Sequence, residues 1–334
     1  MADDLVEIDP SGDVVLVCGH GEDQEASCVL RHASLASPVF KTMLGPNFKE
    51  GKQLSGCGTL HLPLPDDDGA QMAIICNTIH LRHNKVPRRL TLTQLSEVAI
   101  LVDKYDCAMA LGPMAEHWVC ELKNGSGASS RAGLIYSAYL LRLPTLFRDL
   151  SVDELLCCAY HSPKDAPLSQ AGPMVEKLIA SISGESFLAR HKILVFIDRQ
   201  IVLYTDAGRQ KSDNCLRAYE YTMDFLRKLK EVKLWPLSLS YDPTVQTMLQ
   251  NMESTEWKQE TLDDCTYKGK TVNTCFCGSG QAHGSAEIRN RFMGQVKTIR
   301  SAMPVACLEC TLEDSVWKKA DCKHVHDSTS SFGI

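Results

Sequence analysis

The chain has 334 residues, enough for two domains of ordinary size. Its composition is that of a globular protein, with 44% hydrophobic and 23% charged residues, and its formal net charge is −6. The charge is uneven, because residues 1–122 carry 9 Lys and Arg against 17 Asp and Glu. An acidic surface repels phosphate and anionic lipid, so we expect neither nucleic acid nor a membrane as a partner.

The first ten residues are acidic and lack an apolar core, so they do not have the pattern of a signal peptide. The sequence also lacks the run of about 18 apolar residues that a transmembrane helix needs. We therefore expect an intracellular protein, in the cytoplasm or the nucleus. In that setting its 15 cysteines should be mostly reduced.

The most informative stretch runs from Ser34 to Gly51. Ser37 can cap a helix, and Pro38 suits the first helical position. One helical stripe then contains Leu35, Ala36, Val39, Phe40, Met43 and Leu44. Because Gly45-Pro46-Asn47 stops a helix, we predict a short amphipathic helix followed by a turn and a polar loop.

Strands and helices are predicted on both sides of this stretch. The β-rich runs Val14–Cys18 and Ser27–Leu30 read as a hairpin, and Gln71–His83 reads as a helix. Thr91 with Gln94 has the pattern of a capping box at the start of another helix. We expect Gly112-Pro113 to end one element before a helix at Met114–Leu122.

Five segments together resemble the BTB/POZ domain, in the version common in filamentous fungi. These are Gly12–Val17, Cys28–His32, the Ser34–Gly51 stretch, Leu60–Asp68 and Val98–Cys107. The resemblance covers residues 10–122 and implies an α+β protein-interaction module that self-associates. We expect the apolar stretch Leu5–Ile8 to pair with another chain in such an association.

The resemblance also implies a partner for Phe48-Lys49-Glu50. In BTB proteins that recruit a cullin scaffold, a hydrophobic-x-Glu motif at this place contacts the cullin. Phe48 and Glu50 are therefore candidate partner-binding residues. The alternative is that Phe48 closes the local core and Glu50 is simply solvated.

The rest of the chain divides into two further parts. Lys123–Ser130 reads as a linker. Residues 131–233 are predicted to form a helical region, and residues 234–334 an irregular Cys/His-rich tail. The helices expected in the middle region are Ala132–Leu141, Val152–Tyr160, Gly172–Ser183, Phe187–Tyr204 and Cys215–Lys230.

Cysteines and a histidine in the tail have spacings that suit zinc, which favours Cys and His ligands in closely spaced pairs. The candidate ligands are Cys275, Cys277, Cys307, Cys310, Cys322 and His324, and Cys265 could replace a member of the first pair. Cys307-x-x-Cys310 fits the pattern of a zinc knuckle. A helix predicted over Ala286–Ala302 would bring the two halves of the site together. Unligated thiols and a redox Cys-x-x-Cys are the alternatives.

The sequence contains neither the G-x-S-x-G nor the H-E-x-x-H pattern, and its histidines follow no triad order, so we expect no enzyme. The predicted fold is α+β, with a BTB/POZ-like N-terminal module, a mainly helical region and a Cys-rich tail. The predicted function is a protein-interaction scaffold, as a homodimer and as a substrate adaptor for a cullin-type ubiquitin ligase. The alternative function is a zinc-binding transcriptional regulator.

Overall fold

The computed structural model has an α+β fold that separates into two compact units. The first contains residues 1–151, 163–178 and 306–326, and the second contains residues 152–162, 179–305 and 327–334. The two units therefore alternate along the chain. The structure describes residues 5–19, 26–30, 33–55, 59–125, 131–158, 173–210, 216–236, 243–255, 265–267, 270–272, 285–313, 315, 317–319 and 321–323.

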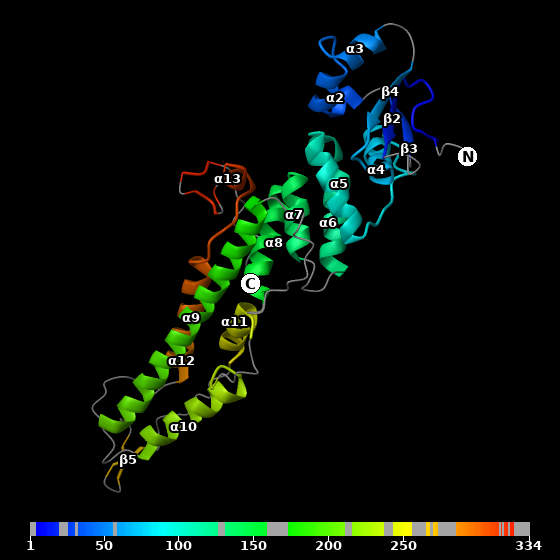
Figure 1. Ribbon diagram of the computed structural model, residues 1–334. Coiled ribbons are helices and arrows are strands. Elements are labelled where there is room, and N and C mark those ends of the chain that lie inside the picture. The colour runs from blue at the N-terminus through cyan, green and yellow to red at the C-terminus, as the bar shows by residue number, and fades with distance from the viewer. Residues whose placement is uncertain are drawn as a thin grey trace. The chain divides into compact units, whose positions relative to one another are not determined.

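The first unit contains a four-stranded sheet in the order β1-β3-β2-β4 (Figure 1). Its strands are β1 (Leu5–Glu7), β2 (Val14–Cys18), β3 (Ala26–Leu30) and β4 (Leu60–Leu64). The predicted hairpin is confirmed, since β2 and β3 pair antiparallel, and β4 lies parallel to β2. Along β4, alternate leucines are buried, as a period of two requires. The strand β1 pairs with β3 of its own chain, where we had expected it to pair with another chain.

The predicted amphipathic helix is divided into α1 (Ala33–Ala36) and α2 (Pro38–Met43). Ser37 caps α2 as expected, by accepting a hydrogen bond from the Phe40 N–H. Pro38 has no N–H to continue α1, so the two helices do not share one apolar stripe. As a result Phe40 is buried, whereas Leu35, which we expected on the same stripe, is 83% exposed.

A third short helix, α3 (Lys49–Leu54), occupies part of the stretch predicted to be a loop, and it contacts β4. Its position depends on Gly51, which is buried against the preceding turn. A Cβ atom at Gly51 would lie only 1.9 Å from the carbonyl oxygen of Gly45. Only a residue without a side chain permits this close approach of two backbones.

Two longer helices of the first unit begin at side-chain caps. Asp68 caps α4 (Gly69–Ile79), and Thr91 and Gln94 form the predicted capping box of α5 (Leu92–Lys104). The helix α6 (Ala108–Gly125) passes through Pro113, so the expected break at Gly112-Pro113 is wrong. Two helices follow, α7 (Arg131–Leu140) and α8 (Pro144–Cys157).

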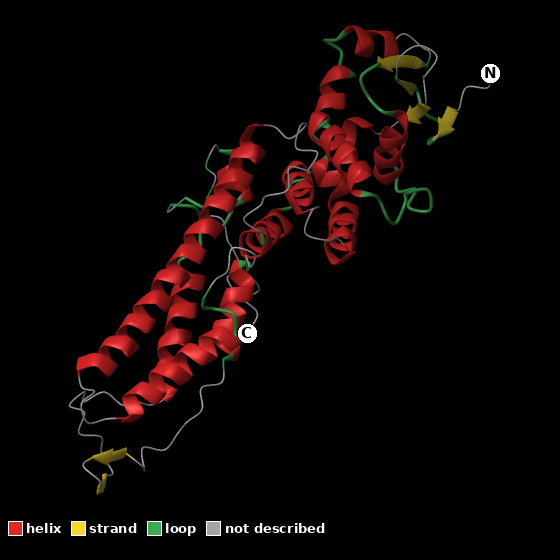
Figure 2. Ribbon diagram, turned by 60° about the horizontal axis from the view of Figure 1, so that its bottom comes forward, coloured by secondary structure: helices red, strands yellow, loops and turns green. Residues whose placement is uncertain are grey.

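The second unit is built from helices around one apolar cluster. They are the part of α9 (Pro173–Gln210) from Ile179 onward, α10 (Leu216–Glu231), α11 (Val245–Ser254) and α12 (Ser285–Ser301). The ring of Phe292 meets Phe196 edge-on at 5.1 Å, and α9 and α12 run side by side in Figure 1 and Figure 2. The cluster includes Ile193, Ile197, Phe225, Leu229, Val245, Met248, Phe292 and Val296.

Two predictions in this part of the chain are corrected. The expected helices Gly172–Ser183 and Phe187–Tyr204 are one helix, α9, because a single Gly184 costs about 1 kcal/mol and does not stop a helix that is buried on both sides of it. The helix α11 lies in the stretch predicted to be irregular, where Thr244 caps it. The predicted helix Ala286–Ala302 is confirmed as α12. A short antiparallel hairpin is formed by β5 (Cys265–Tyr267) and β6 (Lys270–Val272).

The packing of Gly51 predicts a large penalty for Gly51→Ala. The added methyl group would force α3 away from the preceding turn, and overpacking of this kind costs about 1–3 kcal/mol. Urea denaturation of the full chain measures the loss. Gly112→Ala in α6 is the matched control, since nothing lies within 4 Å of its added Cβ, and it should leave stability unchanged or raise it by up to about 1 kcal/mol. Equal stabilities for the two variants would contradict the close approach.

Candidate functional site

A cluster of three cysteines close enough to hold a metal ion lies where the chain returns to the first unit. Cys307 is the N-cap residue of α13 (Leu308–Leu312), a single-turn helix near the C-terminus. The neighbouring residues Ala306, Leu308 and Thr311 are buried. This segment is therefore packed against the rest of the protein. The Thr311 hydroxyl donates to the Cys307 carbonyl over 2.8 Å, which holds the turn that carries Cys307 and Cys310.

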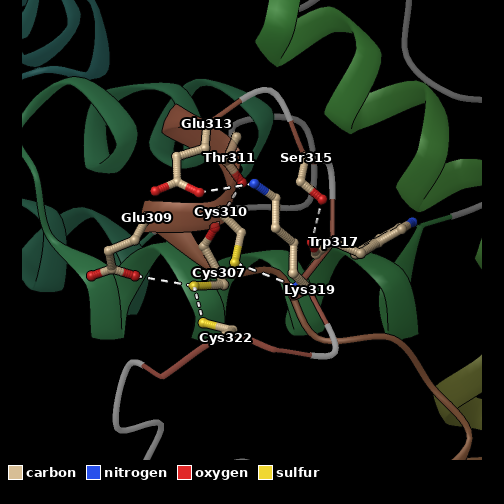
Figure 3. Close-up of polar contacts among 9 residues, drawn as sticks. All are labelled: Cys307, Glu309, Cys310, Thr311, Glu313, Ser315, Trp317, Lys319 and Cys322. Carbon is tan, nitrogen blue, oxygen red and sulfur yellow. Dashed lines mark hydrogen bonds and ion pairs between the residues drawn. The ribbon is translucent and has the colours of Figure 1, made fainter.

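Three cysteine sulfurs converge at this place. The Sγ atoms of Cys307, Cys310 and Cys322 all lie within 4.8 Å of one another, and Figure 3 shows Cys322 approaching from the loop after α13. The Sγ atoms of Cys307 and Cys322 are 3.7 Å apart. Two thiolates on one tetrahedral zinc, each about 2.3 Å from the ion, would be separated by about 3.8 Å. The spacing therefore fits a shared metal ion.

Backbone hydrogen bonds hold the loop that brings Cys322 back to α13. The Cys310 carbonyl accepts a 2.8 Å bond from the Ser315 N–H, and the Cys310 sulfur accepts a 3.4 Å bond from the Lys319 N–H. The Lys319 ammonium pairs with Glu313 over 2.8 Å, as Figure 3 shows. These contacts hold the loop after α13 beside the Cys310 sulfur.

The Cys307 thiol is in an environment that opposes a lone negative charge. Burial raises the pKa of Cys307 above its ordinary value, and a backbone hydrogen bond with Cys310 lowers it in part. Side-chain hydrogen bonds with Glu309, Cys310 and Cys322 raise it further. The Glu309 carboxylate is 3.1 Å from the Cys307 sulfur. Without a cation, Cys307 would therefore keep its proton. A divalent ion removes this penalty because it neutralises the clustered thiolates.

The structure brings together three of the six predicted metal ligands. Cys275, Cys277 and His324 lie outside the described residues, and of Cys265 only the backbone, in β5, is described. The sequence identified Cys307 and Cys310 from their spacing, and Cys322 from its place beside His324. It did not identify Glu309 or the Lys319 N–H as neighbours of the sulfurs, because their contacts depend on the loop after α13.

The predicted partner-binding residues lie on the surface of the first unit. Phe48 is the N-cap residue of α3 and is 46% exposed, and Glu50 in the first turn of α3 is half-buried. The alternative in which Phe48 closes the local core is therefore wrong. An exposed aromatic ring on a helix fixed by Gly51 is an available anchor for a partner.

A second surface feature is an apolar groove of about 560 Å³ beside β1. Its apolar lining residues include Ile8, Leu35, Ile79, Leu81 and Ala110, and its polar lining residues are Asp9 and His80. The Arg82 guanidinium donates hydrogen bonds to the carbonyl groups of Glu7 and Ile8, which holds the end of β1 at the groove.

Comparison with known proteins adds no identification: no protein-family model, no curated protein and no solved structure matches the chain. Among the described helices, none is both long enough and apolar enough to cross a membrane.

Proposed function

We propose that this chain is a protein-interaction adaptor whose N-terminal part is a BTB/POZ-like module. The observation that carries the proposal is the exposed Phe48 ring at the start of α3, in the sequence Phe48-Lys49-Glu50. The order of the elements supports it as well, since a β2–β3 hairpin, short helices, β4 and two longer helices follow one another as the resemblance implies.

The binding surface would use Phe48 as the anchor and Glu50 as the polar group beside it. A half-exposed aromatic side chain has little conformational freedom to lose on binding and a large apolar area to bury. The partner expected from the resemblance is a cullin scaffold, which would make the chain a substrate adaptor of an intracellular ubiquitin ligase. This role requires no catalytic group of the chain itself.

Self-association is also part of this proposal. Because β1 pairs within its own chain, an association by strand exchange would require β1 to leave β3. A second route would bury the apolar groove lined by Leu35 and Leu81 against another copy. Sedimentation of the full chain at micromolar concentration tests for the dimer, and a strict monomer would rule it out.

The tail would be held by one structural zinc ion on Cys307, Cys310 and Cys322. Zinc suits this donor set because it prefers thiolate and imidazole ligands in a closed tetrahedral site. The fourth ligand would come from the remaining predicted candidates, of which His324 follows Cys322 by two residues. A zinc-binding transcriptional regulator remains the alternative function, and the acidic N-terminal region makes DNA a poor partner for it.

For the partner surface, we predict that Phe48→Ala weakens binding of a purified cullin by at least about 30-fold, because loss of an anchor residue costs about 2 kcal/mol or more. Titration calorimetry with the full chain measures the change. Lys49→Ala is the matched control, since Lys49 is exposed at the adjacent position of α3 and should bind as the unchanged chain does. If the unchanged chain binds no cullin, this part of the proposal is wrong.

For the metal centre, we predict about one zinc ion per chain and its loss in Cys307→Ser and Cys310→Ser. Structural zinc contributes on the order of 10 kcal/mol to the folding of small zinc domains, so chelation should also release the tail from its packed state. Elemental analysis of protein purified without a metal-affinity tag measures the content. Cys120→Ser is the control, because Cys120 in α6 belongs to a different part of the first unit. Zinc near zero in the unchanged chain would refute the site.

A further inference from the structure

We infer that Cys307 and Cys322 form an oxidative modification site, at which a hydroperoxide converts the two thiolates into a disulfide and displaces the metal. The inference rests on the proposed zinc site and names how that site would be regulated. The disulfide would join Cys307, the N-cap residue of α13, to Cys322 in the loop that returns to this helix. It would not join the two cysteines of the Cys307-x-x-Cys310 motif.

The geometry favours this pair of sulfurs. Cys322 contacts Cys307 with a sulfur–sulfur separation of 3.7 Å, and a disulfide bond needs about 2.05 Å. Closing this gap requires a movement smaller than 2 Å, which the loop carrying Cys322 can supply more easily than the packed segment around Cys307. Ala306 and Leu308 on either side of Cys307 are both buried.

The solvent exposure of the three cysteines determines which sulfur the oxidant reaches first. Cys307 and Cys310 are only 1% and 3% exposed, whereas Cys322 is half-buried and follows the exposed Asp321. A small oxidant dissolved in water therefore reaches Cys322 first. Cys310 is less exposed than Cys322 and its sulfur already accepts the Lys319 N–H, so Cys310 is less suited than Cys322 to react first with the oxidant.

The chemistry is a two-electron oxidation of two thiolates. The Cys322 thiolate attacks the outer oxygen of the hydroperoxide, the O–O bond breaks, and the leaving oxygen takes up a proton to become an alcohol or water. The Cys307 thiolate then attacks the sulfenic sulfur of Cys322, forming the S–S bond and expelling hydroxide. The hydroperoxide is reduced, and the two thiolates are oxidised.

The metal cannot remain after this step. A disulfide sulfur is no longer a thiolate and so no longer a zinc ligand, which leaves Cys310 as the last of the three thiolates. Loss of the zinc ion would then destabilise the packing of residues 306–326 within the first unit. Reduction of the disulfide and addition of zinc would restore the site.

Treating the zinc-loaded full chain with hydrogen peroxide tests the inference. We expect zinc release, detected with a chromogenic chelator, and a Cys307–Cys322 linked peptide in a non-reducing digest, both reversed by dithiothreitol and zinc. Cys310→Ser keeps both members of the pair, so it should still form the linked peptide even where it binds little zinc. Cys322→Ser should form none.

The outcomes separate the two proposals. If the unchanged chain contains no zinc, the metal centre is wrong, and the presence or absence of the Cys307–Cys322 linked peptide then supports or overturns the modification site by itself. If the chain contains zinc and peroxide releases none, or yields a Cys307–Cys310 link or sulfinic acid without any link, the modification site is overturned and the zinc site stands.

Discussion

The buried carboxylate of Asp67 is the interaction on which the first unit depends. Its side chain is 1% exposed, and it accepts hydrogen bonds from the Tyr105 hydroxyl and the Lys104 ammonium. A buried ion without partners would cost several kcal/mol, so these two donors must be held in place. Burial, and secondly the bond to Asp67, raise the pKa of Tyr105, which keeps its proton available for this bond. The turn before α4 is thereby tied to the end of α5.

The same tyrosine connects this ion to the proposed partner surface. Its ring stacks on Phe40 at a centroid distance of 4.5 Å, and its carbonyl oxygen accepts a hydrogen bond from Ser37, the cap of α2. From α2 the chain passes through Gly45 to Gly51, whose close approach sets the position of α3 and of Phe48. The proposed partner surface is thus positioned by contacts inside the first unit.

The sequence predicted features that depend on neighbouring residues. The caps at Ser37 and Thr91 were found because a cap and its helix are adjacent in the chain. The three thiols were found because zinc ligands follow a short spacing rule. The exposure of Leu35 and the presence of α3 were missed, since they depend on how Pro38 redirects the chain and on contact of Gly51 with Gly45. The bond between Tyr105 and Asp67 was also missed, because the two residues are 38 positions apart and no local pattern links them.

Hydrogen exchange of the full chain with Tyr105→Leu tests most directly the claim that Tyr105 fixes the partner surface. This change removes both the hydroxyl group that bonds Asp67 and the ring that stacks on Phe40. We predict that the amides of α2 and α3 exchange faster in the variant, by at least the factor of about 10 that 1.4 kcal/mol of lost local stability produces, while those of α12 in the second unit do not change. Unchanged protection of α2 and α3 would contradict the account.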